Sequence, residues 1–284
     1  MELNFRNEKR RNGGRDKMRR NDRFVPRETA PEETEGQLEG RNALTEALRA
    51  GRTIDKVFVA DGETDRGLQR LAAQAKEAGA VIVPVDRRKL DTMSVTHAHQ
   101  GVIALAAAHE YATVDDILEE AAARGETPLI VICDELTDPH NLGAILRSAE
   151  CAGAHGVIIP KRGGAGITPT VSKSSAGAVS ILPVARVANI GQTVRWLKEQ
   201  NVFVYCAQMG GVTPYKQDLT GPLAIVMGSE GRGVSPLVQK LCDGTLSLPM
   251  AADCGGVDSF NVSVAAGMLL YEIDRQRALR AEKE

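Results

Sequence analysis

The sequence has few cysteines and no apolar run long enough to cross a membrane. Its five cysteines are odd in number and widely spaced, at Cys133, Cys151, Cys206, Cys242 and Cys254. This spacing argues against a disulfide framework and against a zinc site, so we expect mostly core or incidental thiols. No apolar segment approaches the length of a membrane span, and the arginine-rich start differs from a secretory signal. We expect a cytoplasmic protein that uses neither a membrane nor a metal.

The sequence also lacks a dinucleotide-binding fingerprint and a phosphate-loop lysine motif. What it has instead is a short apolar run, Leu223–Met227, followed at once by Gly228, Gly231 and Gly233. This pattern predicts a buried strand ending in a glycine-rich turn, where main-chain N–H groups can approach a ligand. Glu230 in the turn would repel a triphosphate and would tolerate a neutral or cationic ligand, such as a sulfonium methyl donor. A purely structural turn is the alternative.

Charge is unevenly distributed along the 284 residues, although the net charge is only −2. Residues 1–27 hold ten Lys or Arg against four Asp or Glu, and they are poor in apolar side chains. Because such an arm cannot bury enough surface to fold alone, we expect residues 1–34 to be a basic, disordered tail drawn to phosphates. A solubilising tail without a partner is the alternative. The rest of the chain is long enough for two domains.

Strands and helices alternate over residues 35–108, which predicts a small α/β domain. The expected elements are a helix opening at Glu39–Leu48, strand Lys56–Ala60, helix Asp65–Ala78, strand Val81–Val85, helix Arg87–Met93 and strand Gly101–Ala108. His97 and His99 alternate as on a strand and could face one side together. Because two histidines lack a third metal ligand, loop or surface positions are favoured over a metal site.

Residues 109–127 are rich in alanine and glutamate, which predicts a helical linker. This linker leads into a second α/β domain, residues 128–284. Its expected elements are strands Leu129–Cys133, Gly156–Pro160, Ile181–Ala185, Val202–Ala207, Leu223–Met227 and Thr245–Met250, a helix over 168–178, helix Ile190–Glu199, a polar turn Met209–Thr220 and a final helix from Ser259. Open α/β folds bind ligands where the carboxyl ends of parallel strands meet. The glycine turn, the loop after Met250 and the helix start at Ser259 should therefore converge on one crevice.

The second informative stretch is a helix that follows strand Leu129–Cys133. Asp138 can cap its start and Pro139 suits its first position. Its apolar positions predict a buried stripe, from whose centre Arg147 lies about 150° away at ~100° per residue. Exposed arginines are usually only solvated. Asn141, Gly143 and Arg147 could equally form a polar wall of a site.

Three ordered motifs of the second domain resemble those of the SpoU, or TrmH-like, class of RNA ribose 2′-O-methyltransferases in the SPOUT superfamily. The first is matched from Asn141 through Arg147 to Gly153, the second by Met227–Gly233, and the third by Leu248-Pro249-Met250 with Ser259–Ala265. Together with the intervening strands they cover residues 128–273, so the signal is specific. Residues 35–108, with Glu39-Gly40-Arg41-Asn42-Ala43, resemble the ribosomal-protein-like substrate-binding domain of enzymes that methylate guanosine in large-subunit rRNA.

The resemblance implies S-adenosylmethionine bound in a deep C-terminal trefoil knot, and a homodimer with active sites at the subunit interface. It also implies site residues by matching position. The implied catalytic group is Arg147, Glu230, Ser259 and Asn261. The implied donor contacts are Gly228, Leu248 and Phe260. The expected RNA contacts are Asn141, Lys173 and Arg41.

The sequence departs from the family pattern at two places near the expected donor site. Phe260 stands where the third motif usually has Leu, and the loop Ala251–Asp258 is about three residues longer than the family norm. The expected contacts are largely to the main chain, so we expect donor binding to persist. Two other functions stay open: methylation of tRNA or of another rRNA nucleotide, and a non-catalytic RNA-binding factor in ribosome assembly.

Overall fold

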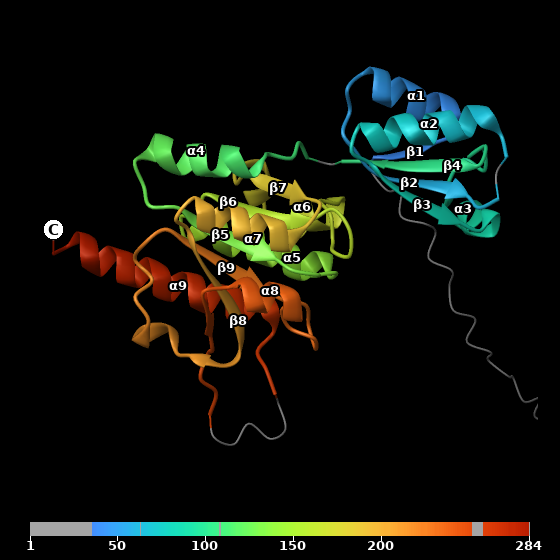
Figure 1. Ribbon diagram of the computed structural model, residues 1–284. Coiled ribbons are helices and arrows are strands. Elements are labelled where there is room, and N and C mark those ends of the chain that lie inside the picture. The colour runs from blue at the N-terminus through green and yellow to red at the C-terminus, as the bar shows by residue number, and fades with distance from the viewer. Residues whose placement is uncertain (1–35, 63, 108, 252–257, 284) are drawn as a thin grey trace, which may run out of the picture. The chain divides into compact units, whose positions relative to one another are not determined.

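The computed structural model describes residues 36–62, 64–107, 109–251 and 258–283 (Figure 1). The expected basic tail, residues 1–34, lies outside these residues, and so do Cys254 and most of the loop Ala251–Asp258. No helix in the described part of the chain is long and apolar enough to cross a membrane.

The first α/β domain is built on a four-stranded mixed sheet in the order β1-β4-β2-β3. Its elements are β1 (Gln37–Glu39), α1 (Arg41–Arg49), β2 (Ile54–Ala60), α2 (Arg66–Glu77), β3 (Val81–Val85), α3 (Arg87–Met93) and β4 (Val102–Ala106). Helices α1 and α2 bury their apolar stripes on one face of the sheet, and α3 packs through Leu90 on the other (Figure 1). The sequence patterns predicted every element of this domain except β1.

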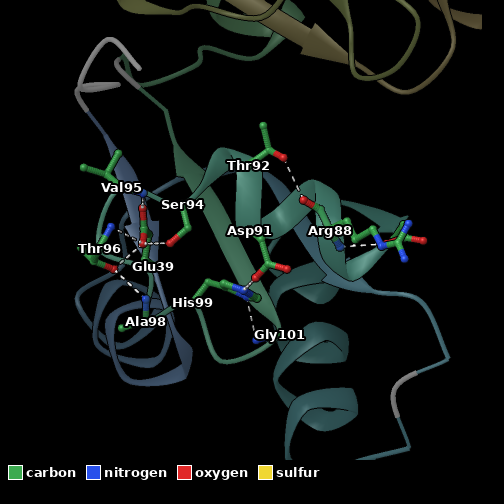
Figure 2. Close-up of polar contacts among 11 residues, drawn as sticks. Glu39, Arg88, Asp91, Thr92, Ser94, Val95, Thr96, Ala98, His99 and Gly101 are labelled. Carbon is green, nitrogen blue, oxygen red and sulfur yellow. Dashed lines mark hydrogen bonds and ion pairs between the residues drawn. The ribbon is translucent and has the colours of Figure 1, made fainter. Parts of the chain in front are cut away.

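Glu39, at the end of β1, holds the segment between α3 and β4 (Figure 2). Its carboxylate accepts hydrogen bonds from Ser94 Oγ at 2.6 Å, Val95 N at 2.6 Å and Thr96 N at 3.1 Å, and from Thr96 Oγ1. Burial alone would raise the pKa of Glu39, but these bonds, with one from Gln37, outweigh it and lower the pKa to about 2. The group therefore stays ionised as an anchor of the fold.

His97 and His99 do not share one side of a strand, because both lie in the loop before β4. His97 is exposed with a left-handed φ of 55°. His99 is buried, where Nδ1 accepts from Gly101 N at 3.1 Å and Nε2 contacts Asp91 Oδ1 at 2.9 Å (Figure 2). The strand alternation suggested by the sequence was wrong here, and the loop position that we favoured is confirmed.

The second domain has a six-stranded, wholly parallel sheet in the order β10-β8-β9-β5-β6-β7. The strands are β5 (Leu129–Cys133), β6 (Gly156–Pro160), β7 (Val184–Val187), β8 (Phe203–Val212), β9 (Leu223–Met227) and β10 (Gly244–Leu246). The helices are α4 (Val114–Arg124), α5 (Pro139–Cys151), α6 (Pro169–Ser174), α7 (Ile190–Glu199), α8 (Pro236–Leu241) and α9 (Val262–Ala281). Helix α4 lies in the stretch 109–127 that was expected to be a linker, but it packs through Ile117 against this sheet. Apolar side chains of α5, α6 and α9 form the core on one face, and those of α4, α7 and α8 form the core on the other.

Several boundaries in the second domain differ from the sequence prediction. Strand β8 continues to Val212 into the expected polar turn, because it pairs there with β10. The expected 168–178 helix ends at Ser174 and is followed by a 3₁₀ turn, Ala178–Ser180, so that β7 starts at Val184. Helix α9 starts at Val262 rather than Ser259. Helix α8 was not predicted.

Arg277 attaches the second half of α9 to the beginning of the sheet. Its guanidinium donates to the carbonyls of Thr127 at 2.8 Å, Pro128 at 2.9 Å and Gly221 at 2.9 Å. These carbonyls precede β5 and β9, the two central strands. The second half of α9 is thereby fixed to the start of the two central strands.

We expect Glu39→Gln to lower the free energy of unfolding of the first domain by about 1–3 kcal/mol at neutral pH, because a charged acceptor of several hydrogen bonds is lost. Folding lowers the pKa of Glu39 from 4.5 to about 2. Its stabilisation is therefore complete above about pH 4.5 and is lost as the pH falls toward about 2. Denaturant titrations of the full chain at decreasing pH, read from NMR amide signals of β2 and β4, measure this difference.

The matched control is Glu46→Gln on α1. The carboxylate of Glu46 is 69% exposed and pairs with an exposed arginine, Arg49. We expect a change below about 0.5 kcal/mol there. Equal stability losses in the two variants would contradict the anchoring role of Glu39.

Candidate active site

The glycine-rich stretch after β9 forms a tight turn closed by its own main chain. Ser229 N donates to Gly233 O at 3.0 Å, and Gly233 N donates to Ser229 O at 2.8 Å. Gly228 permits this closure, since a Cβ there would lie 2.0 Å from the carbonyl carbon of Gly233. Glu230 and Arg232 are therefore presented at the tip of a constrained loop.

Asp134 secures the downstream end of this turn from the neighbouring strand. It follows β5, is only 4% exposed, and accepts a hydrogen bond from Ser235 N at 2.8 Å. Its own N–H donates to Met227 O at 2.8 Å. One buried residue thus binds both ends of the turn that carries Glu230.

Three segments distant in sequence meet at the carboxylate of Glu230. Its Oε1 accepts from Asn141 Nδ2 and from Asn261 Nδ2, each at 2.8 Å. Asn261 Nδ2 also contacts Asn141 Oδ1 at 3.0 Å. The start of α5, the glycine turn and the start of α9 are therefore joined by one hydrogen-bonded triangle.

Asn261 has a second role as the N-cap of α9. Its Oδ1 accepts from Ser263 N at 3.0 Å, Val264 N at 3.3 Å and Ser263 Oγ at 2.6 Å. These donors fix which end of the amide faces the helix, so Nδ2 must face Glu230. The same cap explains why α9 begins at Val262.

A cavity of about 690 Å³ lies beside the triangle. It is lined by the end of β8, the glycine turn, the segment Leu246–Leu248 and the approach to α9. All three expected donor contacts, Gly228, Leu248 and Phe260, line it. The convergence predicted from the sequence is therefore present. The contribution of Ala207, Gln208 and Met209 from β8 was not predicted, because the strand was expected to end at Ala207 and a polar turn to begin at Met209.

The cavity wall combines apolar and polar groups in the way that small-molecule sites do. Met227, Leu246 and Leu269 supply apolar surface, and the turn supplies main-chain groups. Its charged side chains in the described part of the chain are Glu230, Asp258 and Arg232. With two carboxylates and one guanidinium, the cavity is better suited to a cationic ligand than to an anionic one.

The other two expected catalytic residues, Ser259 and Arg147, are not part of the hydrogen-bonded triangle. Ser259 lines the cavity and is exposed. Arg147 is exposed on α5, as its helical position predicted, but it does not line the cavity, and no described residue pairs with it. At ~100° per residue it lies about 120° around the helix from Asn141. Within one chain it therefore does not face the triangle.

The expected RNA contacts are spread over both domains. Lys173 is exposed on α6. Arg41, at the start of α1, pairs with Asp65 at 2.9 Å and donates to Gln100 O at 3.3 Å. Asn141 is 7% exposed, and its amide is used within the triangle. Gly143, considered as part of a polar wall, is instead buried against α6, where a Cβ would lie 1.9 Å from Ser174 Oγ.

The described residues contain no group of three or more His, Cys, Asp or Glu side chains able to hold a metal ion. Of the cysteines in the described part of the chain, Cys133 and Cys206 are buried in the core. Cys151 is exposed, and Cys242 is half-buried.

Comparison with known families divides the chain in the same way as its two sheets. Residues 128–271 match the SpoU rRNA Methylase family. Residues 37–112 match the family described as RNA 2′-O ribose methyltransferase substrate binding. Both regions that carried the sequence resemblance are therefore matched.

Curated relatives are similar over most of the chain. A TrmH-family tRNA/rRNA methyltransferase of Bacillus subtilis, YacO, is 45% identical over 84% of this chain and 94% of its own. A protein of Mycobacterium tuberculosis named a tRNA/rRNA methyltransferase is 44% identical over 87% of this chain and 76% of its own.

Solved structures are similar as well. The SpoU methyltransferase AviRb of Streptomyces viridochromogenes, in complex with AdoMet, is 25% identical with a TM-score of 0.54, over 85% of this chain and 90% of that one. An AdoMet-bound rRNA methyltransferase of Sinorhizobium meliloti is 25% identical with a TM-score of 0.51, over 84% of this chain and 86% of that one.

Proposed function

Because the chain belongs to the SpoU family of RNA 2′-O-methyltransferases, which use S-adenosylmethionine, we propose that it methylates a guanosine ribose in large-subunit rRNA. This is the reaction of RlmB, the enzyme whose front domain the sequence resembles. The observation that carries the proposal is the triangle of Asn141, Glu230 and Asn261 beside a cavity of suitable size and charge. The matched substrate-binding domain supports RNA as the substrate.

The cavity provides what a sulfonium methyl donor needs. S-adenosylmethionine, when bound, supplies an already activated methyl group, so most of the rate should come from alignment. The main chain near Gly228 and Leu248 would hold the adenosine part, and Phe260 would cover it. Glu230, which lines the same cavity, would supply negative charge that favours a cationic sulfonium. Because these contacts would be largely to the main chain, we expect Phe260 to be compatible with donor binding.

The acceptor ribose needs a group that orients its 2′-oxygen and stabilises the negative charge that develops on it. Arg147 suits this role, because a guanidinium binds phosphate and oxyanions bidentately and resists deprotonation. Glu230 and Asn261 would fix the position of the reacting ribose relative to the methyl group. Ser259, on the same cavity wall, can donate to or accept from the ribose.

Arg147 does not face the triangle of its own chain, but in a homodimer it could reach the triangle of the partner subunit. Val264, Met268 and Tyr271 form an exposed apolar stripe on α9, and Tyr271 is 71% exposed. The stripe lies beside α5, since a Cβ on Gly267 would lie 3.7 Å from Ser148 Oγ. We propose that a second copy of the chain covers this stripe, that Arg147 of one subunit then lies near Glu230 of the other, and that each active site is shared by two subunits.

The first test is methyl transfer from labelled S-adenosylmethionine to large-subunit rRNA transcripts and to unmodified tRNA, followed by mapping of the label. We expect 2′-O-methylguanosine at one rRNA position. Label on tRNA alone would refute the proposed target and favour a tRNA enzyme. If calorimetry detects no binding of S-adenosylmethionine, even with RNA present, the chain is a non-catalytic assembly factor instead.

Arg147→Lys tests the role assigned to the guanidinium. Lysine keeps the charge and loses the planar pair of donors, so we expect turnover to fall about 100-fold or more with an unchanged dissociation constant for S-adenosylmethionine. Arg195→Lys, at an exposed position of α7, is the matched control and should retain full activity. Full activity of Arg147→Lys would exclude the assignment.

Mixed dimers test whether the site is shared. We expect Arg147→Lys and Glu230→Gln, each inactive alone, to recover activity when the subunits are exchanged, because one site of the mixed dimer then has both native groups. Glu230→Gln mixed with Asn261→Ala should stay inactive, since these two residues belong to the same triangle. No recovery in the first mixture would place Arg147 and Glu230 in one subunit's site.

A further inference from the structure

The loop Val95–Gln100 of the first domain is fixed near its start by the side chain of Glu39 and near its end by that of its own residue His99 (Figure 2). At its start, Glu39 accepts the N–H groups of Val95 and Thr96, at 2.6 and 3.1 Å. At its end, buried His99 accepts from Gly101 N at 3.1 Å. The loop therefore has a defined main-chain path, although most of its side chains are exposed.

Two exposed side chains of this loop occupy a main-chain conformation that normally favours glycine. His97 has φ 55° and Gln100 has φ 49°. Such positions cost roughly 1–2 kcal/mol each for a non-glycine residue and persist only when the surroundings determine them. Glu39 and His99 explain how the loop is held. They do not explain why an imidazole and an amide occupy positions where glycine would relieve the strain.

The chemistry of these side chains matches that of a base-reading surface. A glutamine amide presents a donor and an acceptor side by side, and an imidazole can stack on a base or bond its edge. Arg41 lies at the foot of the loop, where its Nε donates to Gln100 O at 3.3 Å. This domain is the part of the chain that matches a family of RNA substrate-binding domains.

We propose that the loop Val95–Gln100 contacts unpaired bases of the RNA substrate through His97 and Gln100, and that Glu39 pre-organises it. Unpaired nucleotides are the usual targets of sequence-specific RNA recognition, because their base edges and faces are accessible. A loop already held in its bound shape loses little conformational entropy on binding. The inference rests on the proposed RNA methyltransferase function and does not depend on whether the RNA is rRNA or tRNA.

The test uses the full chain with His97→Ala and Gln100→Ala combined, and the RNA probes are large-subunit rRNA transcripts and unmodified tRNA. We expect the RNA dissociation constant to rise roughly 10-fold, the loss typical of one base contact. The slope of log affinity against log salt should stay unchanged, because no phosphate contact is removed. The dissociation constant for S-adenosylmethionine should also be unchanged. A domain that merely unfolded would change the salt slope as well.

Two further variants separate recognition from folding. Gln74→Ala, an exposed glutamine on α2 of the same domain, should bind RNA like the wild type. Glu39→Gln should speed hydrogen exchange at the amides of Val95 and Thr96 and weaken RNA binding, with His97 and Gln100 intact. Addition of RNA to the wild type should protect the loop amides from exchange.

The outcomes distinguish this inference from the proposed target. Weaker binding of the double variant to tRNA, with no methylation of rRNA, would support the loop and reject the rRNA target. Methylation of rRNA with wild-type affinity in the double variant would support the target and overturn the loop. Absence of RNA binding by the wild type to either probe would overturn both.

Discussion

The second domain depends on one shared acceptor, the carboxylate of Glu230. It binds the amides of Asn141 and Asn261, so three chain segments that each begin or end at the same edge of the parallel sheet are held together. Each partner is itself constrained: Asn261 by capping α9, Asn141 by burial, and Glu230 by a turn that only glycine at position 228 can close. Such mutual constraint gives the site a fixed geometry before any ligand arrives, as catalysis by alignment requires.

Both domains use a carboxylate in the same way. Glu39 in the first domain and Asp134 in the second each accept main-chain N–H groups from a neighbouring loop and thereby fix it. The loops that they fix carry His97 and Gln100 in one case and Glu230 in the other. The chain thus places the exposed side chains for which we propose a function on loops, and it determines the loop conformation with an acidic group outside them.

Much of the fold could be predicted because many of its strands read as short apolar runs, and β5, β6 and β9 are buried on both faces over almost all of their length. Strands β3, β5, β6 and β9 were predicted with their observed bounds, and Gly228, Leu248 and Phe260 do line one cavity. The elements and boundaries that were predicted wrongly have local causes. Strand β1 is too short to show a period, β8 reaches Val212 only through pairing with β10, and the start of α9 is set by the cap at Asn261. The triangle itself depends on tertiary contacts that no local pattern encodes, and the trefoil knot implied by the family resemblance stays a prediction.

The attachment of Arg277 has a mechanical consequence. Its three carbonyl partners lie before β5 and β9. At the other end of the same helix, Asn261 is the N-cap. Helix α9 is therefore pinned at both of its extremities, and it can neither slide along its axis nor turn about it without breaking one set of bonds. A pull on the C-terminal end of α9 would therefore load the three Arg277 hydrogen bonds first, and these bonds protect the Asn261 amide that contacts Glu230.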